Sequence, residues 1–336
     1  MSESAVIFGL EGPELTSDER AFFKSAEPWG FILFQRNCVS HEQVRKLTDA
    51  LRVLSGRSEL PILIDEEGGR VQRLKPPEWR KRSAMRAFGA LYEKDRARGI
   101  EAAQVNAQLI ASDLIELGIN VDCVPSLDVP VAGSHNIIGD RAFASDPTTV
   151  ATLGRVVAET ICEAGLLPVI KHMPGHGRAM LDTHEALPRV STPREELSRT
   201  DFAPFKALND QALGMSAHVI FESIDPDLPA TLSPKVIGDV IRGEIGFEGL
   251  LMTDDLNMNA LQGTVGDRAA RALKAGIDVI LHCNGKFAEM QEIAKIVPKL
   301  AGQAKARADA AAQLLKRPRA QAKIADAEER LKELLA

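Results

Sequence analysis

The chain has 336 residues, of which 45% are hydrophobic and 26% are charged, as in globular proteins with a large buried core. The net charge of −6 and the absence of long basic runs argue against nucleic acid as the main partner. The four cysteines have no metal-ligand spacing, which indicates reduced thiols and a cytoplasmic location. No signal-peptide pattern and no apolar stretch of about 20 residues appear, so no membrane partner is expected.

Short runs rich in valine, isoleucine and leucine alternate along the chain with amphipathic stretches. Such runs are typical of parallel strands that are buried on both faces. Strands are expected at residues 5–10, 30–34, 61–65, 120–124, 168–172, 214–218, 250–253 and 278–282. Helices are expected at residues 17–25, 41–54, 100–117, 147–164, 194–208, 234–244, 266–275 and 286–296. Ser40, Asp146 and Ser233 are start signals for three of these helices.

Eight strands that alternate with helices predict an α/β fold, a single-domain (β/α)8 barrel of the TIM type over residues 1–300. A doubly wound open sheet is the alternative that strand counting leaves open. The segment after the first strand, Gly9-Leu10-Glu11-Gly12, is not GxGxxG, which disfavours a dinucleotide fold. The tail at 301–336, rich in helix-forming residues and interrupted at Pro318, predicts extra C-terminal helices packed outside the barrel.

Charged and imidazole side chains follow nearly every expected strand. The active site of such a barrel lies at the carboxyl ends of its strands, so these side chains are expected at one rim. They are Asp65, Glu66, Glu67, Arg70, Asp122, Asp128, Lys171, His172, His176, His218, Asp254, Asp255 and His282. Any one of them alone could be a helix cap or an ion pair, but their recurrence favours a site.

The first specific segment is IDEEGGRVQR at 64–73. Its two glycines permit a sharp turn and close approach to a ligand, and an ionised Asp65 can accept hydrogen bonds from two sugar hydroxyls. The alternative is a simple turn with a surface ion pair to Arg70.

The second segment is KHMPGHG at 171–177, followed by Asp182-Thr183-His184. Asp182 and His184 share a side of an extended segment, where the carboxylate can orient the imidazole for proton transfer. Zinc held by His172, His176, Asp182 and His184 is an alternative, but the spacing matches no common zinc pattern.

The third segment is MTDDLNM at 252–258. Two adjacent aspartates at a strand exit point in different directions, so one can face the barrel axis while the other caps the following turn. A carboxylate at the end of an apolar strand suits a nucleophile or a base, although helix capping alone is the plainer interpretation.

Together these segments resemble glycoside hydrolase family 3, and in particular its single-domain bacterial β-N-acetylglucosaminidases (β-N-acetylhexosaminidases) of peptidoglycan recycling. The resemblance covers the chain to about Gly285 and includes IDEEGGRVQRL at 64–74 and IGDRAF at 138–143. KHMPGHG with DTH distinguishes these enzymes from the β-glucosidases of the family. The chain departs from the usual family pattern at Met173, where an aromatic residue is common, and at Glu66, where most relatives have Gln or His.

The resemblance implies a role for each matching residue. Asp254 corresponds to the nucleophile, and His184 to the general acid/base that Asp182 orients. The residues that match positions holding the N-acetylglucosamine hydroxyls are Asp65, Arg141, Lys171 and His172. No metal or cofactor is implied, and a monomer is expected.

The expected reaction is the retaining hydrolysis of terminal β-linked N-acetylglucosamine through a covalent glycosyl-Asp254 intermediate. The implied substrate is N-acetylglucosamine linked to 1,6-anhydro-N-acetylmuramic acid, in a muropeptide or a disaccharide. Three alternatives remain. They are a phosphorylase that uses the same Asp/His site, a non-catalytic carbohydrate-binding barrel, and a metal-dependent barrel enzyme.

Overall fold

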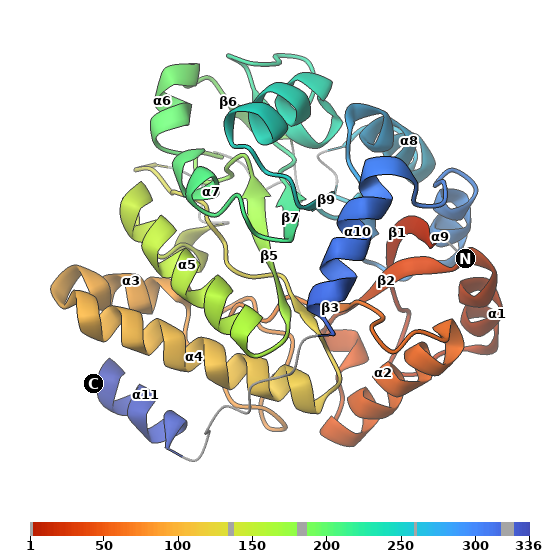
Figure 1. Ribbon diagram of the computed structural model, residues 1–336, viewed down its shortest axis with the longest axis horizontal. Helices are drawn as coiled ribbons and strands as arrows, with labels where there is room; N and C mark the ends of the chain where they lie inside the picture. Colours follow the sequence, from red (N-terminus) through yellow and green to blue (C-terminus); the bar gives the residue numbers. More distant parts are fainter. Residues whose placement is uncertain (1–2, 134–137, 180–186, 259–260, 317–325) are drawn as a thin grey trace.

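The computed structural model describes residues 3–133, 138–179, 187–258, 261–316 and 326–336. Eight parallel strands surround a central axis (Figure 1). They are β1 (Ser4–Gly9), β2 (Pro28–Leu33), β3 (Ile62–Ile64), β4 (Val121–Asp122), β5 (Leu167–Met173), β7 (Leu213–Ser216), β9 (Leu250–Met252) and β10 (Ile280–His282). All eight expected strands are therefore confirmed, with shifts of at most two residues at their starts and ends.

The strand order is β10-β1-β2-β3-β4-β5-β7-β9, and the two ends of this order meet. Met252 pairs with Val279 in a parallel bridge, and the N–H of Asp278 donates to the carbonyl of Leu251 at 3.0 Å. An open sheet would leave two edge strands without a partner, whereas this sheet closes on itself. The (β/α)8 barrel is confirmed, and the doubly wound alternative is wrong.

Helices cover the outside of the barrel. Two of them begin directly after the expected start signals Ser40 and Asp146, whereas the helix expected at 100–117 begins at Arg96. The helices include α1 (Ser17–Ala26), α2 (His41–Ser55), α4 (Arg96–Glu116), α5 (Pro147–Glu163), α8 (Val265–Ala275) and α9 (Phe287–Ala294). The side chains of Ser40 and Asp146 accept the N–H of Gln43 and Thr149, which satisfies donors that the first turn of a helix leaves free. Ser233 does the same for Val236 at the start of the π-helix η4 (Val236–Glu244).

Three elements differ from expectation. The helix expected at 194–208 is two short helices, α6 (Arg194–Arg199) and α7 (Ala203–Ala207), because Pro204 lacks an N–H and starts a new helix. Helix α3 (Met85–Lys94) was not predicted, since Ala84 at its start has no capping side chain. The small sheet of β6 (Arg189–Val190) and β8 (Ile220–Phe221) is too short to show a periodicity.

Helices α10 (Gly302–Leu314) and α11 (Ala327–Leu335) follow the barrel. In Figure 1, α10 crosses in front of the strands and α11 lies beside α4. Arg307 of α10 donates to the carbonyl of Glu248 at 3.0 Å and to Asp278 at 3.1 Å, just before β9 and β10 begin. Helix α10 therefore covers the amino-terminal end of the barrel, where Ala308 and Ala311 join the cluster of inward-facing strand residues.

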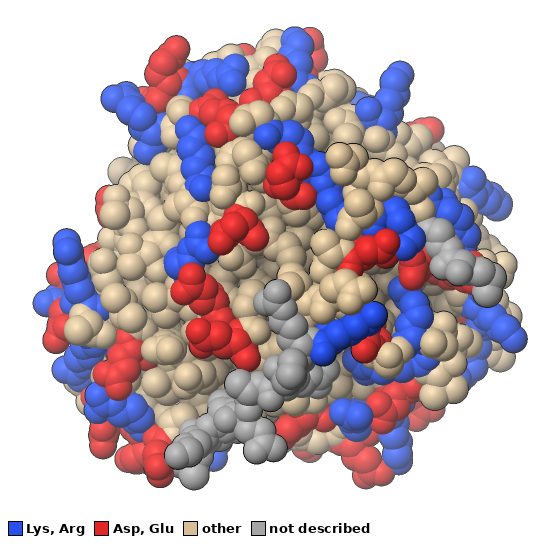
Figure 2. Space-filling view, viewed as in Figure 1, with Lys and Arg blue, Asp and Glu red and all other residues tan. Residues whose placement is uncertain are grey.

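Positive and negative side chains lie interspersed over the face seen in Figure 2. None of the helices in the described parts of the chain combines the length and apolarity needed to cross a lipid bilayer.

Candidate active site

A cavity of about 340 Å³ opens at the carboxyl-terminal end of the barrel, opposite α10. Its size falls within the range of about 300–1,000 Å³ that is typical of small-molecule sites. Its polar lining includes five residues expected at the site, namely Asp65, Arg141, Lys171, His172 and Asp254. Its apolar lining includes Ile32, Phe34, Val71, Met215, Met258 and Leu281. The structure thus brings together five expected site residues that are up to 189 positions apart in the sequence.

The strands explain how these side chains reach the cavity. Asp65 follows β3 directly, Lys171 and His172 belong to the last residues of β5, and Asp254 lies two residues beyond β9. Arg141 comes from a 3-10 helix, η2 (Gly139–Arg141), in the loop between β4 and α5. Its position therefore depends on ion pairing rather than on a strand.

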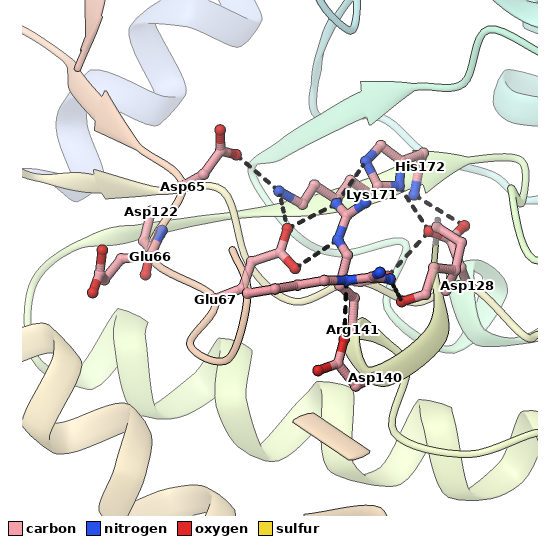
Figure 3. A network of polar contacts seen from close by, with 12 residues as sticks. Asp65, Glu66, Glu67, Asp122, Asp128, Asp140, Arg141, Lys171 and His172 are labelled. Carbon is pink, nitrogen blue, oxygen red and sulfur yellow. Dashed lines mark hydrogen bonds and ion pairs between the residues drawn. The ribbon is translucent and has the colours of Figure 1, made fainter. Parts of the chain in front are cut away.

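A buried ion-pair network crosses the side of the cavity (Figure 3). Lys171 Nζ lies 2.9 Å from Asp65 Oδ1 and 2.6 Å from Glu67 Oε1. Arg141 binds Glu67 with two parallel contacts, Nε to Oε2 at 2.9 Å and Nη2 to Oε1 at 2.8 Å. A paired guanidinium and carboxylate in this fork arrangement fix each other in orientation as well as in distance.

The network keeps its members ionised at neutral pH. Burial raises the pKa of Glu67, but the charges of Arg141 and Lys171 outweigh it and lower the pKa to about 2. Burial lowers the pKa of Lys171, but the carboxylates of Asp65 and Glu67 outweigh it and hold the pKa above its usual range. The cavity therefore presents fixed charges and hydrogen-bonding groups before any ligand arrives.

His172 is held by Asp128, which lies behind the cavity. His172 Nδ1 is 2.7 Å from Asp128 Oδ2, and Asp128 Oδ1 accepts the N–H of His176 at 2.6 Å. Burial raises the pKa of Asp128, but His172 and the His176 N–H hold it below its usual range. Because an ionised carboxylate only accepts, His172 Nδ1 carries a hydrogen.

Asp254 and Asp255 have different surroundings. Burial raises the pKa of Asp254, but the neighbouring His172 and His218 outweigh it, so the pKa lies below its usual value. Asp254 is therefore a carboxylate at neutral pH and lines the cavity. Asp255 Oδ1 accepts the backbone N–H groups of Asn257 and Cys283 at 3.2 and 3.1 Å, which ties two loops together.

His218 supports the backbone next to Asp254. Its Nε2 lies 3.0 Å from the Asp255 carbonyl and its Nδ1 lies 2.8 Å from Thr231 Oγ1. Burial lowers the pKa of His218, although the charge of Asp254 opposes this. Because a carbonyl oxygen only accepts, His218 Nε2 carries the hydrogen that it donates to Asp255.

Two of the expected residues, Asp182 and His184, lie outside the described residues. The alternative ion pair of the first segment is wrong, because Arg70 pairs with Asp140 at 3.0 Å while Asp65 pairs with Lys171 and Arg73. Within the described ranges, no three His, Cys, Asp or Glu residues are placed to hold a metal ion.

Four further residues line or support the cavity, namely Glu67, Arg73, Asp128 and His176. Three of them were expected at the rim but were given no role at the sugar site, and Arg73 was not among the rim residues. Arg73 Nη2 lies 2.9 Å from Asp65 Oδ2, and its guanidinium stacks over the Phe34 ring at 4.9 Å. The alternation of side chains in an extended segment was the available signal for Glu67, since it shares a side with Asp65. Arg73 and Asp128 lie on loops, where no such periodicity exists.

Residues 9–317 match the family model described as "Glycosyl hydrolase family 3 N terminal domain". The chain belongs to this family. It is thus a glycoside hydrolase, and the family resemblance drawn from the three segments is confirmed.

Curated relatives named Beta-hexosaminidase include one from Alkalilimnicola ehrlichii and one from Aromatoleum aromaticum. The one from Alkalilimnicola ehrlichii is 42% identical over 283 residues, which is 83% of this chain and 80% of the relative. The one from Aromatoleum aromaticum is 35% identical over 320 residues, which is 94% of this chain and 88% of the relative.

Solved structures of this family share the fold. NagZ from Neisseria gonorrhoeae, solved in complex with N-trifluoroacetyl-D-glucosamine, superposes with a TM-score of 0.88 at 28% identity. That match covers 100% of this chain and 99% of NagZ. A family 3 β-N-acetylglucosaminidase from Paenibacillus has a TM-score of 0.85 at 32% identity, covering 98% of this chain and 66% of that chain.

Proposed function

We propose that the protein is a retaining exo-β-N-acetylglucosaminidase, a β-N-acetylhexosaminidase that uses Asp254 as its nucleophile. The observation that carries this proposal is the ionised Asp254 in a sugar-sized cavity, facing a fixed array of charged and imidazole groups. The relatives named Beta-hexosaminidase and the N-trifluoroacetyl-D-glucosamine bound by Neisseria NagZ support N-acetylglucosamine as the sugar.

Four residues are proposed to hold the sugar hydroxyls. Asp65 accepts hydrogen bonds, whereas Lys171 and Arg141 donate them. His172 Nε2, opposite the nitrogen that Asp128 holds, accepts from a hydroxyl. Because these groups already pair with one another in buried positions, little ordering is needed when the sugar binds.

The proposed reaction has two steps. Asp254 attacks the anomeric carbon while His184, oriented by Asp182, protonates the leaving oxygen, which gives a glycosyl ester. His184 then deprotonates a water molecule, the water attacks the ester at the anomeric carbon, and the sugar leaves with its β configuration kept. Histidine suits both roles, because its unperturbed pKa of about 6.5 lets it give and take a proton near neutral pH.

The proposed substrate is N-acetylglucosamine linked to 1,6-anhydro-N-acetylmuramic acid, with or without peptide, in cytoplasmic cell-wall recycling. The enzyme is proposed to act as a monomer without a metal or cofactor.

The test compares nitrophenol release from β-N-acetylglucosaminide and β-glucoside substrates. Wild type should strongly prefer the N-acetyl substrate, and Asp254→Ala should lose at least about 10³-fold in kcat, as expected when a nucleophile is removed. Asp309→Ala, an exposed carboxylate of α10, is the control. An active Asp254→Ala variant would contradict the proposal. A sugar 1-phosphate product in phosphate buffer would favour the phosphorylase alternative instead.

A further inference from the structure

Glu66 lies between two residues of the ion-pair network but points the other way. Figure 3 shows its side chain directed away from Lys171, next to Asp122. The residue is 2% exposed, and its Oε2 accepts the backbone N–H groups of Arg73 and Leu74 at 2.8 and 3.1 Å. One carboxylate oxygen therefore holds the far end of the loop that begins at Glu66 itself.

This loop carries a residue of the cavity. The Arg73 side chain leaves the loop on the cavity side, where Nη2 reaches Asp65 Oδ2 at 2.9 Å and the guanidinium stacks on Phe34. Gly68 and Gly69 give the loop its turn, with φ of 84° and 59°. Two glycines make the loop flexible on its own, so the bonds to Glu66 limit how far Arg73 can move.

We propose that Glu66 is a positioning residue of the sugar site, which holds Arg73 against Asp65 more tightly when its carboxyl group is ionised. The role rests on the proposed function, because it concerns the same sugar site. A charged acceptor forms hydrogen bonds about twice as strong as a neutral one. Protonation of Glu66 would therefore loosen Arg73 and weaken sugar binding without touching the sugar directly.

The surroundings of Glu66 set the pH at which this change occurs. Burial raises its pKa to about 7, although the N–H groups of Leu74 and Arg73 oppose the rise. Asp113 of α4 adds negative charge nearby and is paired with Arg82 at 2.6 Å.

Two neighbours on other elements contribute little charge. Asp122 of β4 accepts the Glu66 N–H at 3.0 Å, and burial raises the pKa of this carboxyl well above its usual value. Burial also raises the pKa of the Cys38 thiol, which follows β2, to about 12. The positive charge of the Arg73 side chain, on the cavity side of the loop, lowers the pKa of Glu66.

The test compares wild type with Glu66→Gln and Glu66→Ala. The KM for the nitrophenyl β-N-acetylglucosaminide and the Kd for N-acetylglucosamine, by calorimetry, are measured from pH 5.5 to 8.5. In wild type, both constants should rise about three- to tenfold as the pH falls from 8 to 6, the effect of weakening one or two hydrogen bonds. In Glu66→Gln they should change less, because the amide oxygen still accepts both N–H groups but does not titrate.

The other titratable groups are common to wild type and Glu66→Gln, so only the difference between their pH profiles reports on Glu66. Glu66→Ala should raise KM about tenfold or more throughout, with a smaller change in kcat. Parallel pH profiles for wild type and Glu66→Gln would overturn the inference, as would a wild-type KM in Glu66→Ala. If Glu66→Ala does not fold, the Glu66→Gln comparison decides alone. A wild type that acts on neither sugar would overturn the proposed function and this role together.

Discussion

Asp128 Oδ2 lies 2.7 Å from His172 Nδ1, and the carboxylate that makes this contact is fully buried. The same carboxylate accepts the N–H of His176 with its other oxygen. One buried group thus sets both the direction of the His172 ring and the start of the loop that follows β5.

Asp128→Asn should lower kcat/KM about 10- to 100-fold. The amide nitrogen would face His172 Nδ1 as a donor, so the proton would move to Nε2, which lies 3.4 Å from the Arg141 guanidinium. The loss corresponds to a charge-assisted hydrogen bond, about 1.5–3 kcal/mol. Nitrophenol release measures it, and Asp146→Asn, which keeps a good helix cap, is the control. Unchanged kcat/KM in Asp128→Asn would show that the ring orientation does not depend on this contact.

Glu67→Gln should destabilise the fold by about 3–5 kcal/mol, because Lys171 and Arg141 would keep buried charges without their shared partner. The pKa of Glu67, lowered to about 2, also predicts a pH dependence. Between about pH 4.5 and 2 the unfolded chain binds more protons than the folded one, so stability falls as the pH falls.

Urea unfolding at pH 6, 5, 4 and 3 measures both effects. Glu67→Gln should show less loss of stability than wild type across this acidic window, whereas the exposed Glu163→Gln should follow wild type. Equal slopes for wild type and Glu67→Gln would contradict the assigned charge state.

The pKa of Glu66 predicts a dependence of stability on pH that is opposite to that of Glu67. Its pKa is raised to about 7, so the folded chain binds more protons than the unfolded one between about pH 4.5 and 7. The stabilisation that protonated Glu66 gives the folded chain is complete below pH 4.5 and is lost as the pH rises through 7. Glu66→Gln should therefore gain stability relative to wild type as the pH rises, by roughly 3 kcal/mol over this window. Urea unfolding at pH 5, 6, 7 and 8 tests this, and a constant difference between the two proteins would refute it.

Removal of α11 should affect the loop that carries Arg73 as well as the fold. Glu328 of α11 lies 2.8 Å from Arg82 Nη1, and the side chain of Arg82 is only 4% exposed. The backbone of Arg82 in turn accepts the N–H of Gly69 and donates to Gln72 at 3.0 Å.

A chain that ends at residue 325 should therefore have a KM raised a few-fold, as for a weakened hydrogen bond of about 1 kcal/mol, and a lower melting temperature. Glu328→Gln should show the KM effect with less loss of stability. Glu329→Gln, which changes an exposed neighbour that pairs with Lys332, should behave as wild type. Wild-type kinetics in both the truncated chain and Glu328→Gln would show that α11 does not influence substrate binding.

The barrel could be predicted because its buried parallel strands appear in the sequence as separate apolar runs. The residues directly after those runs, such as Asp65 and Lys171, could be placed at the rim for the same reason. The different contacts of Glu66 and Glu67 could not be predicted, because they depend on which neighbours lie on each side of the loop. Asp128 depends on a contact 44 positions along the chain, and no local pattern encodes such a contact.

The position of α10 has a consequence for polymers. In the described part of the barrel, packed side chains and α10 fill the end opposite the cavity. A polysaccharide therefore cannot thread through the barrel, and a sugar enters and leaves the cavity at the same end. Under the proposed exo action, the released sugar must leave through this opening before the next terminal residue can bind.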